Sequence, residues 1–269
     1  MNLRKRFLVE PGSSVRLSRI DPDDTAGIKS KDAAEADLSK NIDRLRKLQY
    51  LLYAENRWAL LVVLQAMDAG GKDGTIRHVM GGLNPQGCVV TSFKAPSEEE
   101  REHGFLWRIH QRVPARGDIG IFNRSHYEDV LVARVRKLVP KSVWEKRYEQ
   151  INAFEKTLAG SDVVILKFML HISKDEQRRR LQERLDNPRK RWKLATSDFE
   201  DRKLWDEYQR AYEAALSRCN HAWAPWFVIP ANHKWFRNLA VSEIIVDTLK
   251  SLHMKLPRPA VDVSKLRLD

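Results

Sequence analysis

The stretch LLVVLQAMDAGGKDGTI, residues 60–76, decides the fold. Its apolar start predicts a buried β-strand over residues 60–64, and the small residues Ala69, Gly70 and Gly71 predict a tight turn. Apolar residues then recur at helical spacing after Lys72. A strand, a glycine turn, a lysine and a helix present backbone N–H groups and the positive end of a helix to phosphate. We therefore expect residues 66–75, the phosphate turn, to bind phosphate.

The phosphate turn departs from the common pattern GxxxxGK[ST] at two positions. Ala66 replaces the first glycine, and Asp73 replaces the Ser or Thr that would hold magnesium. The metal-holding oxygen must then come from elsewhere, and Asp68 is the candidate. Lys72 is expected to reach the outermost phosphates. The remaining substrate contacts are expected from Ala69, Gly70, Gly71, Asp73, Gly74 and Thr75. A tight turn that binds no ligand is the alternative from this segment alone.

The composition indicates a globular protein with an anionic partner. The 269 residues are 42% hydrophobic and 31% charged, which is ordinary for a globular chain of one α/β domain. The net charge of +12 is not ordinary. It predicts a polyanionic partner, namely nucleic acid, an acidic membrane surface or a phosphate polymer.

The cysteines and the apolar runs indicate a cytoplasmic protein. Cys88 and Cys219 are far apart and form no metal-binding spacing, so we expect reduced thiols. The basic N-terminus has no long apolar stretch, which predicts no signal peptide. No run of about 18 apolar residues occurs, so no membrane span is expected.

Apolar strand-like runs alternate with helical patterns along the chain. This alternation predicts an α/β fold with a parallel five-stranded sheet covered by helices on both faces. Residues 1–30 are expected to be irregular, and a helix that ends near Asn56 follows. The other strands are expected at 89–93, 118–122, 163–170 and 226–230, and the other long helices at 125–137, 141–160, 174–186, 200–218 and 235–252. We expect one domain over 1–269, with an N-terminal extension over 1–56.

Residues 171–224 contain no strand-like run and are expected to form a helical lid. Six Arg and two Lys occur within residues 178–193, and Pro188 precedes the densest cluster. A mobile basic arm would supply positive charge to phosphates when it closes. A solvated helix face is the alternative explanation of this charge run.

Charged residues follow the ends of the expected strands. In a parallel sheet these ends share one edge, so Lys94, Arg124 and Glu128 should converge on the phosphate turn. Phosphoryl transfer needs charge neutralisation and magnesium, and carboxylates are suitable magnesium ligands. Asp68, Glu128 and Asp129 are placed for that role. For the last two, a stabilising charge at a helix N-terminus is the alternative.

These segments together resemble the polyphosphate kinase 2 family. The resemblance is carried, in order, by QAMDAGGKDGTI (65–76), SFKAPSEEE (92–100), LWRIHQRVPARGDIGIFNRSHYEDVLVARV (106–135), LHISKDEQRRRLQERLDNPRKRWK (170–193) and APWFVIPANHKWFRN (224–238). It implies a P-loop kinase fold with a helical lid. It also implies reversible transfer of the terminal phosphate of inorganic polyphosphate to a nucleotide, with Mg²⁺ as cofactor.

The resemblance also assigns roles to individual residues. The aspartate and lysine of the family's first motif fall on Asp68 and Lys72, while Asn123 stands where the second motif often has aspartate. The sequence NRSHYED is similar to the branch that phosphorylates both AMP and ADP, in which Glu128 would compensate for Asn123. The basic lid residues that match the family by position are Arg178, Arg189, Arg191 and Lys193. A homo-oligomer, either a dimer or a tetramer, is implied as well.

Two other functions remain open from the sequence. An ATP-dependent nucleoside monophosphate kinase would explain the turn and the lid, but it would usually keep GxxxxGK[ST] intact. A basic nucleic-acid-binding protein with a decayed phosphate turn would explain the charge. The intact Lys72 and Asp68 argue against decay, so nucleic acid is not the expected partner.

Overall fold

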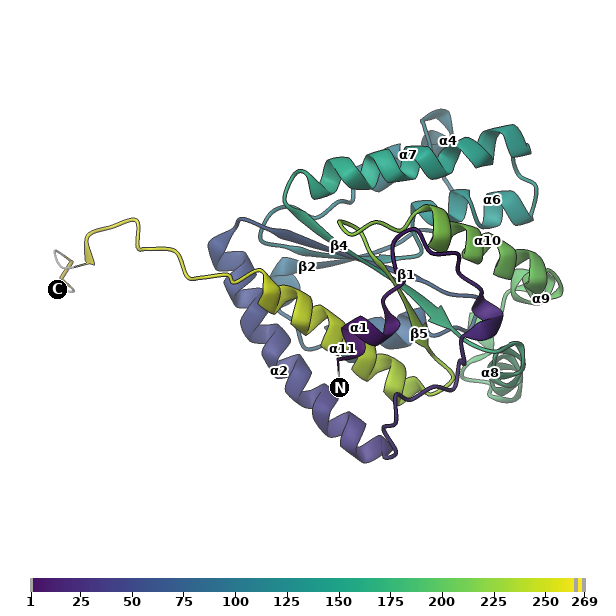
Figure 1. Ribbon diagram of the computed structural model, residues 1–269, viewed down its shortest axis with the longest axis horizontal. Helices are drawn as coiled ribbons and strands as arrows, with labels where there is room; N and C mark the ends of the chain where they lie inside the picture. The colour runs from purple at the N-terminus through teal and green to yellow at the C-terminus, as the bar shows by residue number, and fades with distance from the viewer. Residues whose placement is uncertain (1, 264–265, 268–269) are drawn as a thin grey trace.

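The computed structural model describes residues 2–263 and 266–267. Its centre is a sheet of five parallel strands in the order β2-β3-β1-β4-β5 (Figure 1). The predicted α/β fold with a parallel five-stranded sheet is thereby confirmed, and the predicted strand ends are within one or two residues of those observed. The strands are β1 (Ala59–Gln65), β2 (Cys88–Ser92), β3 (Ile119–Asn123), β4 (Val163–His171) and β5 (Trp226–Pro230).

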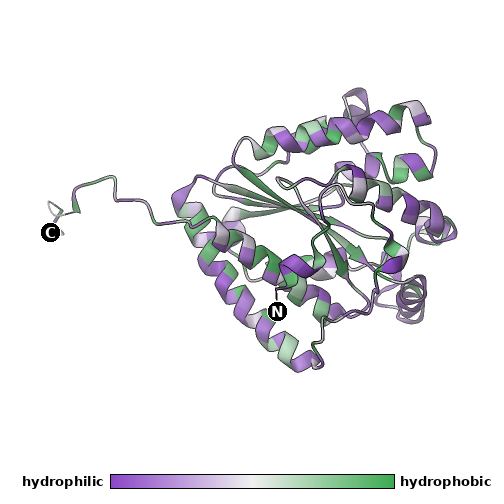
Figure 2. Ribbon diagram, in the orientation of Figure 1, coloured by the Kyte–Doolittle hydropathy of each residue, from purple (hydrophilic) through white to green (hydrophobic). Residues whose placement is uncertain are grey.

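The strands form the apolar centre of the molecule (Figure 2). Every residue of β1 is buried, as expected for a central strand that is covered on both faces. Strand β2 lies at the edge, and its Val89 and Val90 are exposed. The pairing of β1 with β3 places Leu64 opposite Asn123, so the loops after these two strands are neighbours.

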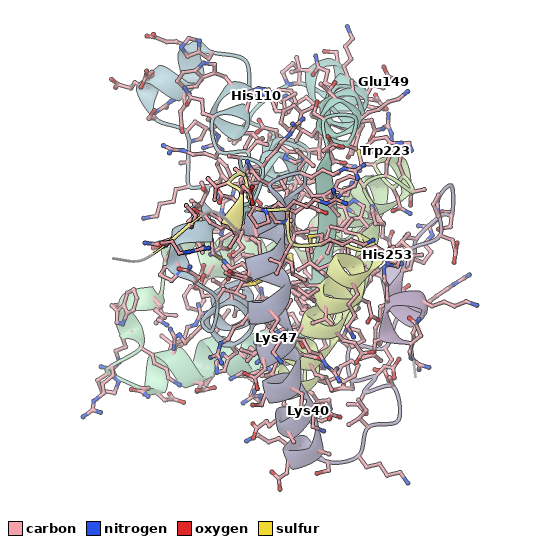
Figure 3. The ribbon with its side chains drawn as sticks, turned by 90° about the vertical axis from the view of Figure 1, so that its left-hand side faces the viewer. Lys40, Lys47, His110, Glu149, Trp223 and His253 are labelled. Carbon is pink, nitrogen blue, oxygen red and sulfur yellow. The ribbon has the colours of Figure 1, made fainter. Side chains whose placement is uncertain are left out.

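Helices cover both faces of the sheet (Figure 1). On one face α2 (Lys31–Glu55) and α11 (Lys234–Ser251) pack side by side, and Lys40 and Lys47 lie on the exposed side of α2 (Figure 3). The phosphate turn opens α3 (Lys72–Thr75), which continues as a π-helical turn over Ile76–Met80 and contacts α11. The other face carries α7 (Lys141–Ala159) and α10 (Trp205–Arg218).

The prediction that residues 1–30 are irregular is wrong in part. A short helix, α1 (Leu3–Phe7), and a 3-10 turn over Leu17–Arg19 form there. Between them, Val9 N–H donates to the carbonyl of Trp226 at 2.9 Å. The segment therefore packs against the edge strand β5, a tertiary contact that local sequence patterns do not reveal.

Two predicted helices are interrupted. Residues 125–137 form a 3-10 turn (His126–Asp129) and then α6 (Val132–Val135). The interruption arises because His126 and Tyr127 both bind the carboxylate of Glu155, whereas consecutive side chains of an α-helix diverge. The second predicted helix, 200–218, is divided at Leu204 into α9 (Thr196–Lys203) and α10.

The remaining helical segments are short, except for α8 of the expected lid. They are α4 (Glu98–Glu102), α5 (Trp107–His110), α8 (Lys174–Asp186) and 3-10 turns at Pro85–Gly87 and Arg191–Lys193. Among the described residues, no helix is long and apolar enough to cross a lipid bilayer.

Candidate active site

The phosphate turn connects the buried end of β1 to α3. Ala69 has φ +60° and Gly71 has φ +105°, so the chain reverses through left-handed backbone. Arg124, in the loop after β3, has φ +63°. Left-handed conformations are uncommon for residues other than glycine and concentrate at functional sites. These two neighbouring loops each hold a non-glycine residue in this conformation, as do five other positions in the described chain.

Lys72 is the first residue of α3, and its side chain folds over the phosphate turn. Its Nζ donates to the carbonyl oxygen of Ala66 at 3.0 Å. Removal from water lowers the pKa of Lys72, and the charge of Arg124 lowers it further, while Asp68 and Glu128 oppose this shift. The ammonium group therefore lies close to the loop that carries Arg124, as the sequence predicted.

A buried arginine lies directly behind the glycines of the turn. Arg237, in the first turn of α11, is 2% exposed, and its Nε and Nη2 donate to Asn238 Oδ1. A Cβ atom added to Gly71 would lie 1.9 Å from Arg237 Nη1, and one added to Gly74 would lie 3.1 Å from Nη2. The guanidinium can approach so closely only because both positions are glycine.

Replacing Gly71 with alanine should therefore impair both stability and function. We expect a loss of about 1–3 kcal/mol in the free energy of unfolding, from left-handed strain and the displacement of Arg237. Urea denaturation measures this change. Gly104→Ala is the matched control, because nothing lies within 4 Å of a Cβ added there. A Gly71→Ala protein as stable as the control would show that the close approach to Arg237 is unimportant.

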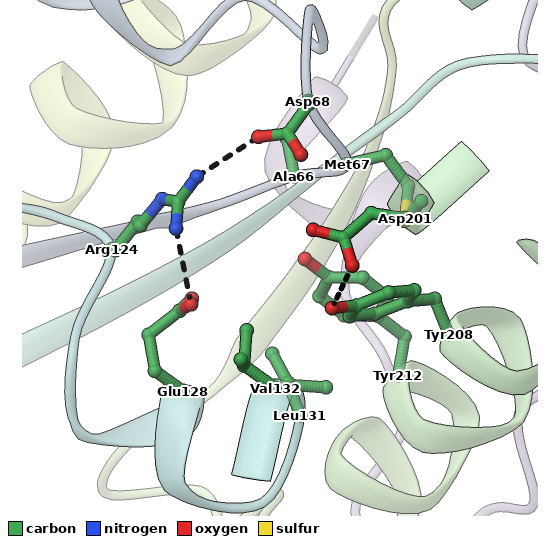
Figure 4. Close-up of a pocket in the computed structure, with 10 residues that line it drawn as sticks. All are labelled: Ala66, Met67, Asp68, Arg124, Glu128, Leu131, Val132, Asp201, Tyr208 and Tyr212. Atoms are coloured by element: carbon green, nitrogen blue, oxygen red, sulfur yellow. Dashed lines mark hydrogen bonds and ion pairs between the residues drawn. The ribbon is translucent and has the colours of Figure 1, made fainter. Parts of the chain in front are cut away.

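Arg124 connects two carboxylates at the mouth of the turn (Figure 4). Its Nη2 donates to Asp68 Oδ1 at 2.9 Å, and its Nη1 lies 3.5 Å from Glu128 Oε2. The two carboxylates raise the pKa of Arg124 above its ordinary value, with Glu128 contributing most. Burial raises the pKa of Glu128, and the charges of Arg124 and Lys72 oppose that shift. The structure thus brings together Asp68, Lys72, Arg124 and Glu128, as expected.

The pocket in front of Arg124 is closed by α9 and α10 (Figure 4). Asp201, Tyr208 and Tyr212 line it opposite Asp68 and Glu128, and Tyr208 donates its hydroxyl to Asp201 at 2.8 Å. Burial raises the pKa of Tyr212 well above its ordinary value, and the charges of Glu128 and Asp68 add to the effect. Sequence reasoning did not identify these three residues. For the two tyrosines the reason is that tyrosines in a helix of ordinary amphipathic pattern indicate packing.

Helix α8 touches the turn through residues that the sequence analysis did not select. Gln177 Nε2 donates to the carbonyl of Asp68 at 3.0 Å. Arg180 is buried, and its Nη1 donates to the carbonyls of Ala69 and Gly70 at 3.0 and 3.2 Å. The available signal was helical spacing, because the apolar Leu181 marks the inward face that Gln177 and Arg180 share.

The basic residues expected from the lid lie elsewhere. Arg178, Arg189, Arg191 and Lys193 are exposed. Arg191 Nε donates to the carbonyl of Leu185, and Lys193 Nζ lies over the ring of Trp192. Within the described residues, no hydrogen bond or ion pair joins these four side chains to the phosphate turn. Their expected role in substrate binding stays a prediction.

Two other expected site residues have no hydrogen bond or ion pair with Arg124 within the described residues. Lys94 is exposed, and its carbonyl oxygen accepts from Arg108. Asp129 Oδ1 binds Arg147 of α7 at 2.9 Å, so this carboxylate fixes α7 and does not face the pocket. Burial raises the pKa of Asp129, with Arg147 opposing. The expectation that Asp129 joins Asp68 and Glu128 is not met.

A buried charge cluster holds the 3-10 turn that carries Glu128. Lys167 of β4 donates to Glu155 Oε2 at 2.5 Å, to the Tyr127 hydroxyl at 2.9 Å and to the carbonyl of Cys219 at 2.7 Å. Glu155 Oε1 in turn accepts from Tyr127 at 2.9 Å and lies 3.0 Å from His126 Nε2. His126 and Tyr127 stand between Arg124 and Glu128 in the chain, so this cluster fixes the position of both.

The donors at the site suit magnesium only together with substrate oxygens. Asp68 and Glu128 offer the hard carboxylate oxygens that magnesium prefers. Within the described residues, no three His, Cys, Asp or Glu side chains are grouped closely enough to hold a metal ion. Magnesium usually retains waters and binds one or two carboxylates with substrate phosphates, and this site fits that arrangement.

Comparison with known proteins agrees with this geometry. Residues 28–257 match the model of the family described as polyphosphate kinase 2. The chain belongs to the polyphosphate kinase 2 family. The AMP/ADP-polyphosphate phosphotransferase of Meiothermus ruber is 56% identical over 266 residues, which cover 98% of this chain and 100% of that protein. The ADP-polyphosphate phosphotransferase of Rhodopseudomonas palustris is 46% identical, covering 94% and 92%.

A solved structure shows that the fold is also that of the family. The crystal structure of polyphosphate kinase 2 from Arthrobacter aurescens TC1 matches with a TM-score of 0.94 and 42% identity, covering 98% of this chain and 94% of that one. The expected P-loop kinase fold is confirmed.

Proposed function

We propose that this member of the polyphosphate kinase 2 family, a polyphosphate-dependent nucleotide kinase, transfers the terminal phosphate of polyphosphate to both AMP and ADP. The observation that carries the proposal is that Arg124 links Asp68 of the phosphate turn to Glu128 through two ion pairs. It is supported by 56% identity with a relative named for AMP and ADP. The net charge of +12 suits a polyanionic donor and predicts that binding weakens as salt increases.

In this proposal, catalysis is positioning and charge neutralisation. The backbone N–H groups of the phosphate turn and Lys72 hold the donor phosphate. Arg124 lies at the mouth of the turn, where negative charge develops on the transferred group. The acceptor phosphate must lie in line with the donor, on the side of the turn that carries Arg124.

We further propose Mg²⁺ as the cofactor, with Asp68 and Glu128 as residues that would hold it. When bound, it would neutralise charge on the phosphate oxygens. Asp68 and Glu128 also have a role of their own, because they orient Arg124. The substrate supplies the remaining oxygens.

The location and assembly belong to the same proposal. Cys88 and Cys219 are free thiols, which supports a reducing, cytoplasmic compartment. A homo-oligomer, either a dimer or a tetramer, is supported by exposed apolar side chains near the β2 edge. Tyr50 and Tyr53 of α2 are 65% and 64% exposed, and Val89 and Val90 of β2 are 55% and 47% exposed.

A comparison of donors tests the proposal against the ATP-dependent alternative. Initial rates of AMP phosphorylation would be measured with polyphosphate and, separately, with ATP as the donor. Substantially faster transfer from polyphosphate supports the proposal. Transfer from ATP alone would identify a nucleoside monophosphate kinase.

Replacing Glu128 with asparagine should impair the AMP step more than the ADP step. The substitution removes the carboxylate that holds Arg124 on the pocket side, where the smaller acceptor depends on protein groups for placement. We expect AMP phosphorylation to slow by about tenfold or more, or ~1.4 kcal/mol in transition-state free energy, and ADP phosphorylation to slow less. Steady-state rates with each acceptor provide the measurement. Glu128→Gln, which keeps the size of the glutamate side chain, would be measured alongside it. Equal losses on both acceptors would contradict this role.

A further inference from the structure

Asp73 and Asn123 are in direct contact at the edge of the phosphate turn. Asn123 Nδ2 donates to Asp73 Oδ1 at 2.7 Å. Asp73 lies in the first turn of α3, and Asn123 is the last residue of β3, the strand that pairs with β1. The two side chains therefore meet beside the expected phosphate position, between the end of β3 and the start of α3.

The residue types at these two positions differ from those of a general phosphate loop. In such loops a Ser or Thr hydroxyl directly after the lysine binds magnesium, together with an aspartate from the Walker B segment. Here the position after Lys72 is a carboxylate, Asp73, and the end of the neighbouring strand carries an amide, Asn123. The pair still contains one carboxylate and one neutral oxygen group.

The charge balance of the site distinguishes Asp73 from the other carboxylates. Asp68 and Glu128 are both paired with Arg124. Asp73 is exposed, and its hydrogen-bond partner is the neutral amide of Asn123. Across the described part of the chain, no ion pair involves Asp73. The charge of the neighbouring Lys72 acts on Asp73 without forming an ion pair with it. A carboxylate that an amide orients and that no ion pair engages is suited to bind a metal ion.

We propose that Asp73, oriented by Asn123, is a ligand of the divalent cation that accompanies the phosphate chain. This inference rests on the proposed function, because the phosphates supply the other oxygens. Asp73 would add to Asp68 and Glu128 a carboxylate that Arg124 does not hold. Asn123 is a positioning residue that fixes the Asp73 side chain through Oδ1.

Binding of tripolyphosphate with and without metal tests the proposal directly. Calorimetry would give the Kd of the preformed Mn²⁺–tripolyphosphate complex and that of metal-free tripolyphosphate in EDTA, without nucleotide. The Kd without metal divided by the Kd with metal isolates the contribution of the metal. We expect Asp73→Asn to reduce this ratio by about 10- to 100-fold, the range found when groups that support a metal are removed. Asp43→Asn, on the exposed side of α2, is the matched control and should leave it unchanged.

The exchange variant Asp73→Asn with Asn123→Asp returns one carboxylate and one amide to the pair. It should recover most of the metal-dependent preference that Asp73→Asn loses. An Asp73→Asn ratio equal to that of the wild type would overturn the proposal, even in a protein with normal phosphate transfer. A reduced ratio would support the metal role even if nucleotide transfer were absent, so the two proposals can fail separately.

Discussion

The Lys72→Ala variant is expected to fold normally and to lose phosphate transfer almost completely. The Lys72 ammonium lies over the turn, 3.0 Å from the carbonyl of Ala66, where it faces the expected phosphate position. Alanine removes a fixed positive charge from the transferred group and leaves the backbone of the turn in place. Removal of one such electrostatic group typically costs about 10³-fold or more in rate.

Transfer from polyphosphate to ADP would measure this loss, with circular dichroism to confirm the fold. Lys47→Ala is the matched control, because Lys47 is an exposed lysine on the outer side of α2 (Figure 3). It should retain wild-type rates. Substantial turnover by a folded Lys72→Ala protein would mean that the phosphate turn is not the catalytic centre.

The largest expected effect on stability comes from the Glu155–Lys167 pair, which is remote from solvent. Both side chains are fully buried, and the pair also holds His126 and Tyr127. Glu155→Gln leaves the Lys167 charge without a counter-ion in the interior. Breaking a buried ion pair in this way costs about 3–5 kcal/mol. We expect a loss of this size in the free energy of unfolding, together with slower transfer because Arg124 and Glu128 lose their support.

Urea denaturation of a small set of variants would measure this effect. Glu149→Gln, on the exposed side of the same helix, is the matched control and should change stability little (Figure 3). Adding Lys167→Met to Glu155→Gln removes the unpaired charge and should recover part of the loss. A Glu155→Gln protein as stable as the Glu149→Gln control would show that the pair does not support the fold.

The parts of the site that the sequence predicted are those set by local pattern and by strand ends. The apolar run before Ala69 identifies β1, and the glycines with Lys72 identify the turn. The meeting of Asp68 with Arg124 followed from a general property of parallel sheets, whose carboxyl ends share one edge. Neither inference needed knowledge of how helices pack.

Several of the parts that were missed depend on buried charges. Arg180 belongs to a run of arginines in which Arg178 and Arg179 are exposed, and composition alone does not separate them. Arg237 contacts the turn from a helix more than 150 residues later in the chain. A charged residue is usually assigned to the surface, and that rule fails where a charge supports a loop from inside. Lys167, a single lysine in the apolar strand VVILKFMLH, was the one visible signal of this kind.

The most direct test of the proposed function is a time course of products from polyphosphate, Mg²⁺ and AMP, with no ATP added. Nucleotide chromatography would follow the reaction, with Lys72→Ala as the blank. We predict that ADP appears first and ATP follows, because one site phosphorylates both acceptors. ADP without subsequent ATP would restrict the enzyme to AMP, and the absence of both products would contradict the assignment of polyphosphate as the donor.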